Sequence, residues 1–245
     1  MLLLDITIHK ASFINVISVI DKIDDLELIF RNSGMCLFSS TLMDYLDINL
    51  VIMKDKFESY FCNTNEIRLF LCTSNLYHII NNIVGDKIRF TMDEKKNDDD
   101  DDDEHVLMIS DSDSCDVYSS LIVTYYYNHM FDNLNINFYK NATIFKIKLS
   151  ILKELVSYIN KSSDIIYISC VKGILLFSYN NITTEPKVKL IELGVDVNIN
   201  KTILLNPIVE CCNLLSSCVF LIISSNNIRI AYKIKELGTL YLNFY

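Results

Sequence analysis

The chain has 245 residues, of which 51% are hydrophobic and 22% are charged, with 22 basic and 31 acidic side chains. This apolar fraction is enough to bury a core, which excludes a chain that is disordered throughout, and the length suits one large domain or two smaller ones. The formal net charge of −9 at first argues against a nucleic-acid partner, because binding to phosphates requires a basic surface. No apolar run approaches the roughly 20 residues of a membrane-spanning helix, and Asp5 interrupts the apolar start, so we expect neither a membrane span nor a signal peptide.

The sequence contains an internal repeat. Residues 14–38 and 153–177 align without a gap at an offset of 139. Each segment begins with apolar residues at helical spacing and continues with two strand-like runs around a turn, which carries Gly34 or Gly173. Because the offset is too long for a solenoid repeat, the sequence predicts two similar domains.

The predicted elements follow a similar order in both halves. In the first half, we expect a helix over 13–20, a glycine-turn hairpin, strands over 48–54 and 66–72, a helix over 75–84, a hairpin of 87–92 and 106–110, and a strand over 117–127. In the second half, we expect a helix over 152–159, a glycine-turn hairpin, strands over 187–193 and 195–203, a helix over 205–215, and a closing hairpin of 218–224 and 228–234. Residues 125–143 are polar and typical of a connector. The sequence therefore predicts an α+β fold with two similar domains, 1–124 and 144–245, each with antiparallel sheets and two helices.

Seven consecutive acids occupy residues 98–104, inside a predicted hairpin. An interaction tail or a metal-binding loop is one interpretation, and a solvated loop insertion is the other. The run lacks the spaced ligands and glycine turn of a calcium loop, which favours the solvated loop. Residues 93–104 hold nine acids and two lysines, so a net charge of −7 is concentrated there and only −2 remains elsewhere.

The sequence carries no recognisable catalytic or metal-binding motif. The eight cysteines form no CxxC pair, and the four histidines do not cluster with cysteines or carboxylates. Phosphate-binding glycine loops, a zinc-protease motif and a nucleophile-elbow motif are all absent from the sequence. We therefore expect buried, reduced thiols in an intracellular protein that is not an enzyme and needs no metal or cofactor.

Several short motifs occur in an order that resembles a known family. Close to the end of the chain, residues 232–240 read Tyr-Lys-Ile-Lys-Glu-Leu-Gly-Thr-Leu. Leu-Ser-Ser, at 215–217, precedes the closing hairpin. In the first half, Gly34 is followed by Phe-Glu-Ser-Tyr at 57–60 and by Cys62, and in the second half Ile-Ser-Cys at 168–170 precedes Gly173. Together these motifs resemble proliferating cell nuclear antigen and its relatives, the DNA sliding clamps, over nearly the whole chain.

This resemblance implies a fold, an assembly and a set of partners. Members of the family form head-to-tail homotrimeric rings, in which helices line a hole for duplex DNA and sheets form the outside. The implied partners are duplex DNA, a DNA polymerase, other clamp-binding proteins and a clamp loader. We expect an intracellular location, in the nucleus or in a viral replication compartment.

The resemblance also implies candidate site residues. The basic residues near the predicted helices, which are candidates for DNA contact, are Lys10, Lys22, Lys153 and Lys161. The candidates for a partner-binding pocket are Asp44, Tyr45, Leu134, Ile136, Asn243 and Tyr245. Two strands, near 117–123 and near 173–179, are predicted to be sheet edges that pair between subunits, with the candidate interface residues Tyr118, Leu121, Val123, Leu175 and Phe177.

Some of these candidates have alternative interpretations. Lys22 and Lys161 follow helices, where a cation stabilises the negative end of the helix dipole without touching DNA. Leu134 and Ile136 could simply pack the connector against a domain. The predicted helices also carry Phe13, Ile14, Ile20, Tyr77 and Ile80 at places where the family has basic residues. A second hypothesis is therefore a clamp-like scaffold, serving transcription or a checkpoint complex, that does not encircle DNA.

Overall fold

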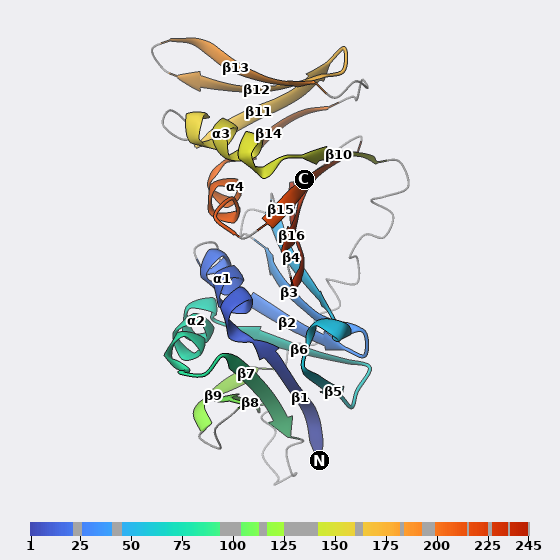
Figure 1. The fold of residues 1–245 in the computed structure, drawn as a ribbon, viewed down its shortest axis with the longest axis vertical. Coiled ribbons are helices and arrows are strands. Elements are labelled where there is room, and N and C mark those ends of the chain that lie inside the picture. Colours follow the sequence, from blue (N-terminus) through green and yellow to red (C-terminus); the bar gives the residue numbers. More distant parts are fainter. Residues whose placement is uncertain are drawn as a thin grey trace. The chain divides into compact units, whose positions relative to one another are not determined.

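The computed structural model describes residues 1–21, 26–40, 46–93, 104–112, 117–124, 142–159, 164–181, 184–192, 199–214, 216–224, 227–234 and 236–244. It is a mixed α+β fold with mostly antiparallel sheets (Figure 1). The chain divides into two compact units, each of which is described by itself. Unit 1 comprises Met1–Ser40, Ile48–Phe131 and Glu236–Thr239, and unit 2 comprises Thr41–Asp47, Asp132–Lys235 and Leu240–Tyr245.

Unit 1 contains two helices that lie side by side and two antiparallel sheets (Figure 1). Its elements are β1 (Leu2–His9), α1 (Lys10–Ile20), β2 (Leu26–Arg31), β3 (Gly34–Ser40), β4 (Leu46–Met53), the short 3₁₀ turn η1 (Lys54–Lys56), β5 (Ser59–Cys62), β6 (Glu66–Leu71), α2 (Thr73–Asn82), β7 (Lys87–Asp93), β8 (Glu104–Asp111) and β9 (Val117–Thr124). One sheet has the order β5-β1-β7-β8-β9, and the strands β6-β2-β3-β4 are neighbours in that order within a larger sheet.

Unit 2 repeats this plan. Its elements are β10 (Thr143–Ile147), α3 (Leu149–Ile159), β11 (Ile165–Val171), β12 (Ile174–Asn181), β13 (Thr184–Glu192), β14 (Asn200–Leu204), α4 (Asn206–Cys211), β15 (Ser216–Ile223), β16 (Ile228–Ile234) and β17 (Gly238–Phe244). The strands β10-β15-β16-β17 are neighbours in that order within a larger sheet, and β14-β11-β12-β13 form a four-stranded sheet.

The two units share one order of elements and one order of strand pairing. The run β1-β7-β8-β9 in unit 1 corresponds to β10-β15-β16-β17 in unit 2, and β6-β2-β3-β4 corresponds to β14-β11-β12-β13. In both units, a helix follows the first strand and a second helix precedes the last three strands. The short strand β5 is an addition to unit 1. The repeat in the sequence therefore has a counterpart in the topology of the described residues.

The two glycine turns form where the sequence predicts them. Gly34 begins β3 in the β2–β3 hairpin, and Gly173 directly precedes β12 in the β11–β12 hairpin; their φ angles of 140° and 76° are ones that glycine adopts without steric cost. At Gly34, an added Cβ would lie 2.2 Å from the carbonyl oxygen of Ile52, so a side chain would also clash with the main chain of β4. Lys172, before Gly173, adopts a φ of 53°. Both hairpins depend on a residue without a side chain at this point.

The core of unit 1 lies between its helices and its sheets. Phe13 on α1 is fully buried, and its ring meets that of Phe90 on β7 edge to face, with centroids 5.9 Å apart. Val16, Ile17 and Ile20 continue the buried stripe of α1 at helical spacing. Phe13 and Ile20 stand at places where the resemblance to sliding clamps leads us to expect basic residues. Both are part of the core.

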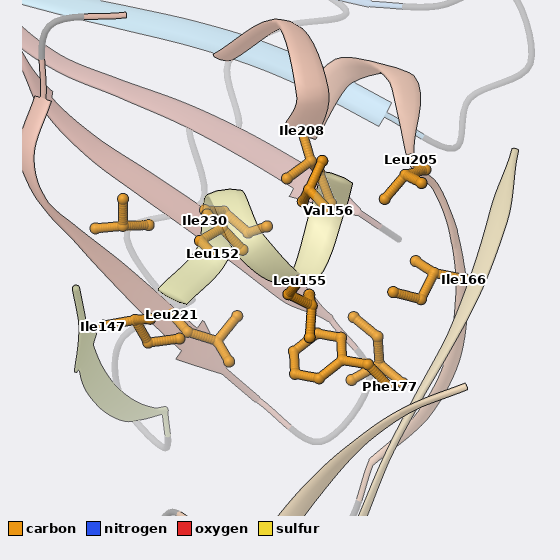
Figure 2. Close-up of a pocket in the computed structure, with 12 residues that line it drawn as sticks. Ile147, Leu152, Leu155, Val156, Ile166, Phe177, Leu205, Ile208, Leu221 and Ile230 are labelled. Carbon is orange, nitrogen blue, oxygen red and sulfur yellow. The ribbon is translucent and has the colours of Figure 1, made fainter. Parts of the chain in front are cut away.

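The core of unit 2 encloses a small apolar cavity of about 20 Å³ (Figure 2). Leu152, Leu155 and Val156 of α3 point into it from one side, and Ile166 and Phe177 of the second sheet close another side. Every lining side chain is apolar, so the cavity has no group that would hold a water molecule. We infer that it is a packing defect rather than a ligand site.

Filling this cavity should stabilise unit 2. We expect Val156→Ile to raise the free energy of unfolding by up to about 0.5 kcal/mol, because a cavity costs about 24 cal/mol per Å³. By contrast, Leu155→Ala should lower it by about 2–5 kcal/mol. Urea unfolding of the two variants measures both effects. A large loss of stability in Val156→Ile would show that the space does not accept another methyl group.

Candidate nucleic-acid and partner interfaces

Lys10, a candidate for DNA contact, is bound within unit 1. Its Nζ donates to the carbonyl oxygen of Asn81 at 3.2 Å and to that of Ile83, both at the C-terminal end of α2. Its backbone N–H donates to the carbonyl oxygen of Asp86. A cation at the C-terminal end of a helix stabilises the negative end of the dipole. Lys10 therefore ties the start of α1 to the end of α2.

Only one other lysine of this candidate set is described. Lys153 is exposed on α3, next to Glu154, which is also exposed. Lys22 and Lys161 lie outside the described residues. The structure thus brings none of the four candidates together into a basic cluster among the residues it describes.

The fully exposed side chains of α1 and α2 carry no formal charge, and the half-buried Lys10 at the start of α1 is bound to carbonyl oxygens. The exposed residues of the two helices are Ala11, Asn15, Ser74, Asn75, His78, Asn81 and Asn82. Next to them, Asp21 accepts a hydrogen bond from the hydroxyl of Ser74 at 2.6 Å. Among the described residues of α3 and α4, the charged residues that are exposed are Lys153 and Glu154, whose charges cancel. The described helices therefore present polar but electrostatically neutral surfaces.

One of the two predicted sheet edges is confirmed and the other is corrected. β9 is the last strand of its sheet, as predicted for 117–123. The side chains of Tyr118, Leu121 and Val123 lie outside what the structure describes. β12 is not an edge, because it lies between β11 and β13.

The prediction that Leu175 and Phe177 lie at a subunit interface was therefore wrong, because the strand that carries them is not a sheet edge. Both side chains are buried, with exposures of 0% and 4%, so they pack in the core of unit 2 rather than face another subunit. The strand at the edge of this sheet is β13, one strand later in the chain. Pro186 lies within β13, and proline is confined to edge strands because it cannot donate a ladder hydrogen bond. This proline was the sequence signal that could have identified the edge.

The partner-pocket prediction is also corrected at Asn243. This side chain is only 1% exposed, and its Oδ1 accepts a hydrogen bond from Nε of Arg229. Its Nδ2 lies 3.4 Å from the carbonyl oxygen of Asp47, to which it donates. The guanidinium of Arg229 also lies over the ring of Tyr241, 5.3 Å from its centroid. Asn243 thus satisfies a buried arginine and is not available to a partner. The other candidates, Asp44, Tyr45, Leu134, Ile136 and Tyr245, lie outside the described residues.

A four-residue ionic cluster on β2 and β6 has no counterpart in the sequence-based predictions. Glu66 Oε2 lies 2.5 Å from Nε of Arg31, and Glu66 Oε1 lies 2.5 Å from Nε of Arg68. Nη1 of Arg68 is 3.6 Å from Oε1 of Glu27, whose other carboxylate oxygen is buried without a hydrogen-bond partner. The strand register places Arg31 opposite Glu66. Alternating opposite charges on both strands were the signal in the sequence.

The two glutamates of this cluster have pKa values shifted in opposite directions. Burial raises the pKa of Glu27 above its ordinary value, and the attraction of Arg68 only partly opposes this effect. Burial also acts on Glu66, but hydrogen bonds from Arg68 and Arg31 outweigh it and hold the pKa of Glu66 below its ordinary value. Ionised Glu27 therefore costs stability near neutral pH, whereas ionised Glu66 contributes stability.

The substitutions Glu27→Gln and Glu66→Gln should change stability at pH 7 with opposite signs. Glu27→Gln should raise the free energy of unfolding by at most about 1 kcal/mol, because it removes a poorly compensated buried charge. Glu66→Gln should lower it by about 1–3 kcal/mol, because it weakens two charge-assisted hydrogen bonds.

Both differences should shrink on acidification. The pKa of Glu27 is raised in the folded protein, so ionisation of Glu27 costs stability only at higher pH. Below the ordinary value of 4.5, Glu27 is protonated in the folded and in the unfolded chain, and the gain in Glu27→Gln disappears there. A lowered pKa means that the contribution of Glu66 is present above 4.5 and is lost as pH falls through its folded value. Urea unfolding at neutral and acidic pH measures both. Destabilisation by Glu27→Gln at pH 7 would show that its contact with Arg68 outweighs its burial.

The burial of a cysteine affects the reactivity of its thiol. Six are free thiols, of which Cys36, Cys211 and Cys212 are buried, as predicted, while Cys72 is exposed. Burial raises the pKa of Cys212 to about 11, and it raises that of Cys211 well above the ordinary value. A protonated thiol is a poor nucleophile and a poor metal ligand. These buried thiols are therefore core residues.

Two further features bear on the kind of site that the chain contains. Within the described ranges, no group of three or more histidine, cysteine, aspartate or glutamate side chains is placed to hold a metal ion. None of the described helices is long and apolar enough to cross a membrane. Comparison with known proteins adds no assignment: no protein-family model and no curated protein matches the sequence.

Proposed function

We propose that the chain is one subunit of a ring-shaped DNA sliding clamp that tethers a DNA polymerase to duplex DNA. The observation that carries this proposal is the order of strand pairing that the two units share, together with the two helices in each unit. A chain built from two similar units can close into a ring by repeating one kind of contact head to tail. The sequence motifs that resemble sliding clamps occur in the same order along these units.

The strand edges support a head-to-tail contact between subunits. β9 has the sequence Val-Tyr-Ser-Ser-Leu-Ile-Val-Thr, with no charged residue and no proline. A long, uncharged edge strand is a template for pairing with another chain, and soluble proteins normally cover or interrupt it. β13 supplies an edge strand in the other unit. Pairing of β9 of one subunit with β13 of the next gives a ring, which we propose to contain three subunits.

The proposed partners follow from enclosure of DNA. A ring that is linked to DNA raises the effective concentration of any polymerase bound to it, without reading sequence. We propose duplex DNA, a polymerase, other clamp-binding proteins and a clamp loader as partners, in the nucleus or a viral replication compartment. The acidic net charge is compatible with this function, because −7 of the −9 belongs to residues 93–104.

A second candidate function is a clamp-like scaffold that does not encircle DNA. The neutral exposed faces of α1 and α2 favour it, because non-specific DNA binding normally depends on lysine and arginine. Light scattering together with polymerase extension on a primed circular template separates the two. A clamp forms a trimer and increases the length of the products, whereas a trimer without this effect supports the scaffold. A strict monomer at micromolar concentration that does not stimulate the polymerase would contradict the clamp.

A further inference from the structure

Four neighbouring strands of unit 2 share a face that is both apolar and positively charged, which we call the cationic apolar face. Its defining residues are Ile144 and Lys146 on β10, Phe220 on β15, Ala231 and Lys233 on β16, and Tyr241 on β17. We propose that this face docks a short acidic segment of another protein, whose apolar side chain packs on the face while its carboxylates meet the lysines. Such docking requires neither a ring nor DNA, so it goes beyond the proposed function.

Strand register and side-chain alternation place these residues on one side of the sheet. Lys146 lies opposite Phe220, and Phe220 lies opposite Ala231. The residues that alternate with them, among them Leu221 and Ile230, point to the other side, where they line the cavity beneath α3 (Figure 2). Because α3 packs against that other side, the cationic apolar face is directed away from the helix and from the core of unit 2.

The centre of the face is apolar and only partly covered. Ile222 and Ala231 form a small buried cluster, and Phe220 and Tyr241 pack against this cluster while they remain half-buried. Ile144, which lies opposite Ile222, is 55% exposed. Two half-buried aromatic rings near an exposed isoleucine offer apolar area that an incoming aliphatic or aromatic side chain can cover.

The charges on these strands are all of one sign. β10, β15, β16 and β17 contain Lys146, Arg229 and Lys233 but no aspartate or glutamate, in a chain whose net charge is −9. Lys146 and Lys233 are exposed, and the buried guanidinium of Arg229 lies over the ring of Tyr241, 5.3 Å from its centroid. Interfaces pair regions of complementary potential, so this face selects a partner segment that carries carboxylates.

The corresponding strands of unit 1 are different. On β7, Arg89 donates two hydrogen bonds to the carboxylate of Asp5 on β1, at 2.8 and 2.7 Å. Lys87 on the same strand lies 2.8 Å from the carboxylate of Glu58. The chain itself therefore balances these cations of unit 1, whereas the four strands of unit 2 supply no carboxylate of their own. This difference between two units of similar topology points to a role for the face outside the fold.

The apolar centre favours a peptide over a nucleic acid as the occupant. Binding to phosphates strengthens with the number of cations that reach them, and two exposed lysines are few for this purpose. A pair between an exposed lysine and a carboxylate also contributes little by itself. We therefore assign most of the affinity to the apolar side chain of the peptide, and we assign its selection among other segments to the charges.

The first part of the test measures the binding of labelled synthetic peptides to the full chain by fluorescence anisotropy. One short peptide carries aspartates and glutamates around two phenylalanines. A second has every acid replaced by its amide, and a third has both phenylalanines replaced by serine. We expect the first to bind, more weakly as salt is raised, and the other two to bind at least about fivefold more weakly.

Charge variants locate the site. Lys146→Gln/Lys233→Gln removes two positive charges from the cationic apolar face, and the control Lys153→Gln/Lys172→Gln removes two from exposed positions elsewhere in unit 2. The face variant should bind the first peptide at least about threefold more weakly than the wild type, and the control should change its affinity by less than about 1.5-fold. Circular dichroism should be unchanged in both, because all four side chains are exposed.

An apolar pair tests the centre of the face. Ile144→Ser removes the exposed isoleucine, and the control Ile151→Ser removes an isoleucine that is 43% exposed on α3. We expect the first substitution to weaken binding at least about threefold and the second to leave it nearly unchanged.

Three results would overturn the inference. The first is the absence of binding by the acidic peptide at low salt, and the second is an equal loss in the face variants and their controls. The third is displacement of the peptide by a short DNA duplex at lower concentrations than by unlabelled peptide, which would assign the face to nucleic acid. Each leaves retention on circular DNA, the test of the clamp, unaffected.

The acidic run of the chain itself is a different occupant, which one deletion distinguishes. Removal of residues 98–104 should change the affinity for the first peptide by less than about twofold. A rise of more than about tenfold would show that this run competes for the face, and it would overturn the assignment to another protein.

Discussion

If β9 forms the proposed contact between subunits, we expect one of two adjacent variants, Leu121→Pro and Ile122→Pro, to lose self-association and to remain a folded monomer. Along an antiparallel edge strand, successive backbone N–H groups point alternately toward the neighbouring strand and away from the sheet. Because β9 is the last strand of its sheet, one of the two residues donates outward, where a second subunit would pair. Proline removes that donor at little cost to the fold. At the other position it breaks the pairing with β8 and destabilises unit 1.

Light scattering and circular dichroism read the two effects separately. The wild type should have about three times the subunit mass of 28.3 kDa, and the outward variant should have the subunit mass with unchanged secondary structure. Lys189→Pro and Leu190→Pro provide the matched pair in β13, which should behave in the same way. If all four variants keep the wild-type mass, the edges do not form the contact between subunits.

Phe13→Ala should destabilise unit 1 by about 3–5 kcal/mol. The Phe13 side chain is completely buried and is in edge-to-face contact with Phe90, so its truncation removes both apolar burial and an aromatic pair. The loss is comparable to a large part of the stability of a typical domain. Thermal or urea unfolding followed by circular dichroism measures it.

Phe70→Ala is the control for this substitution. Phe70 lies on β6 of the same unit, but 53% of its surface is exposed, so its truncation should change stability by less than about 1 kcal/mol. Equal effects of the two substitutions would mean that the helix α1 does not pack through Phe13.

Sequence periodicity predicted the elements that form the repeated units, but not all of their limits. The helix predicted over 205–215 is only Asn206–Cys211, because a turn follows it and β15 begins at Ser216. Strands β1, β5, β10 and β17 received no prediction from periodicity. β1 and β10 run directly into a helix or a single linking residue, so no turn signal separates them from α1 and α3. Glycine turns, by contrast, mark the two hairpins directly.

Site prediction depended on which strand is internal, and the apolar pattern of a strand does not contain that information. The apolar pattern of the strand that carries Leu175 and Phe177 is compatible with an edge strand and with a central strand. The position of β13 beside it shows that this strand is central. Asn243 has a polar side chain near the end of the chain, which favours exposure, but a hydrogen bond from Arg229 compensates its burial. Lys10 is a cation near a helix, and only its contacts with the end of α2 distinguish a cap from a DNA ligand. In each example, a long-range contact decided the role.

Retention on circular DNA tests the ring around DNA most directly. The full chain is incubated with nicked circular plasmid and a clamp loader, and protein that co-elutes with the DNA is measured before and after the plasmid is cut once. A topologically linked ring stays with the circle and is lost after linearisation, because it slides off the free ends, and high salt should change its retention on the circle little. Equal retention on circular and linear DNA, or no retention on either, would contradict the account.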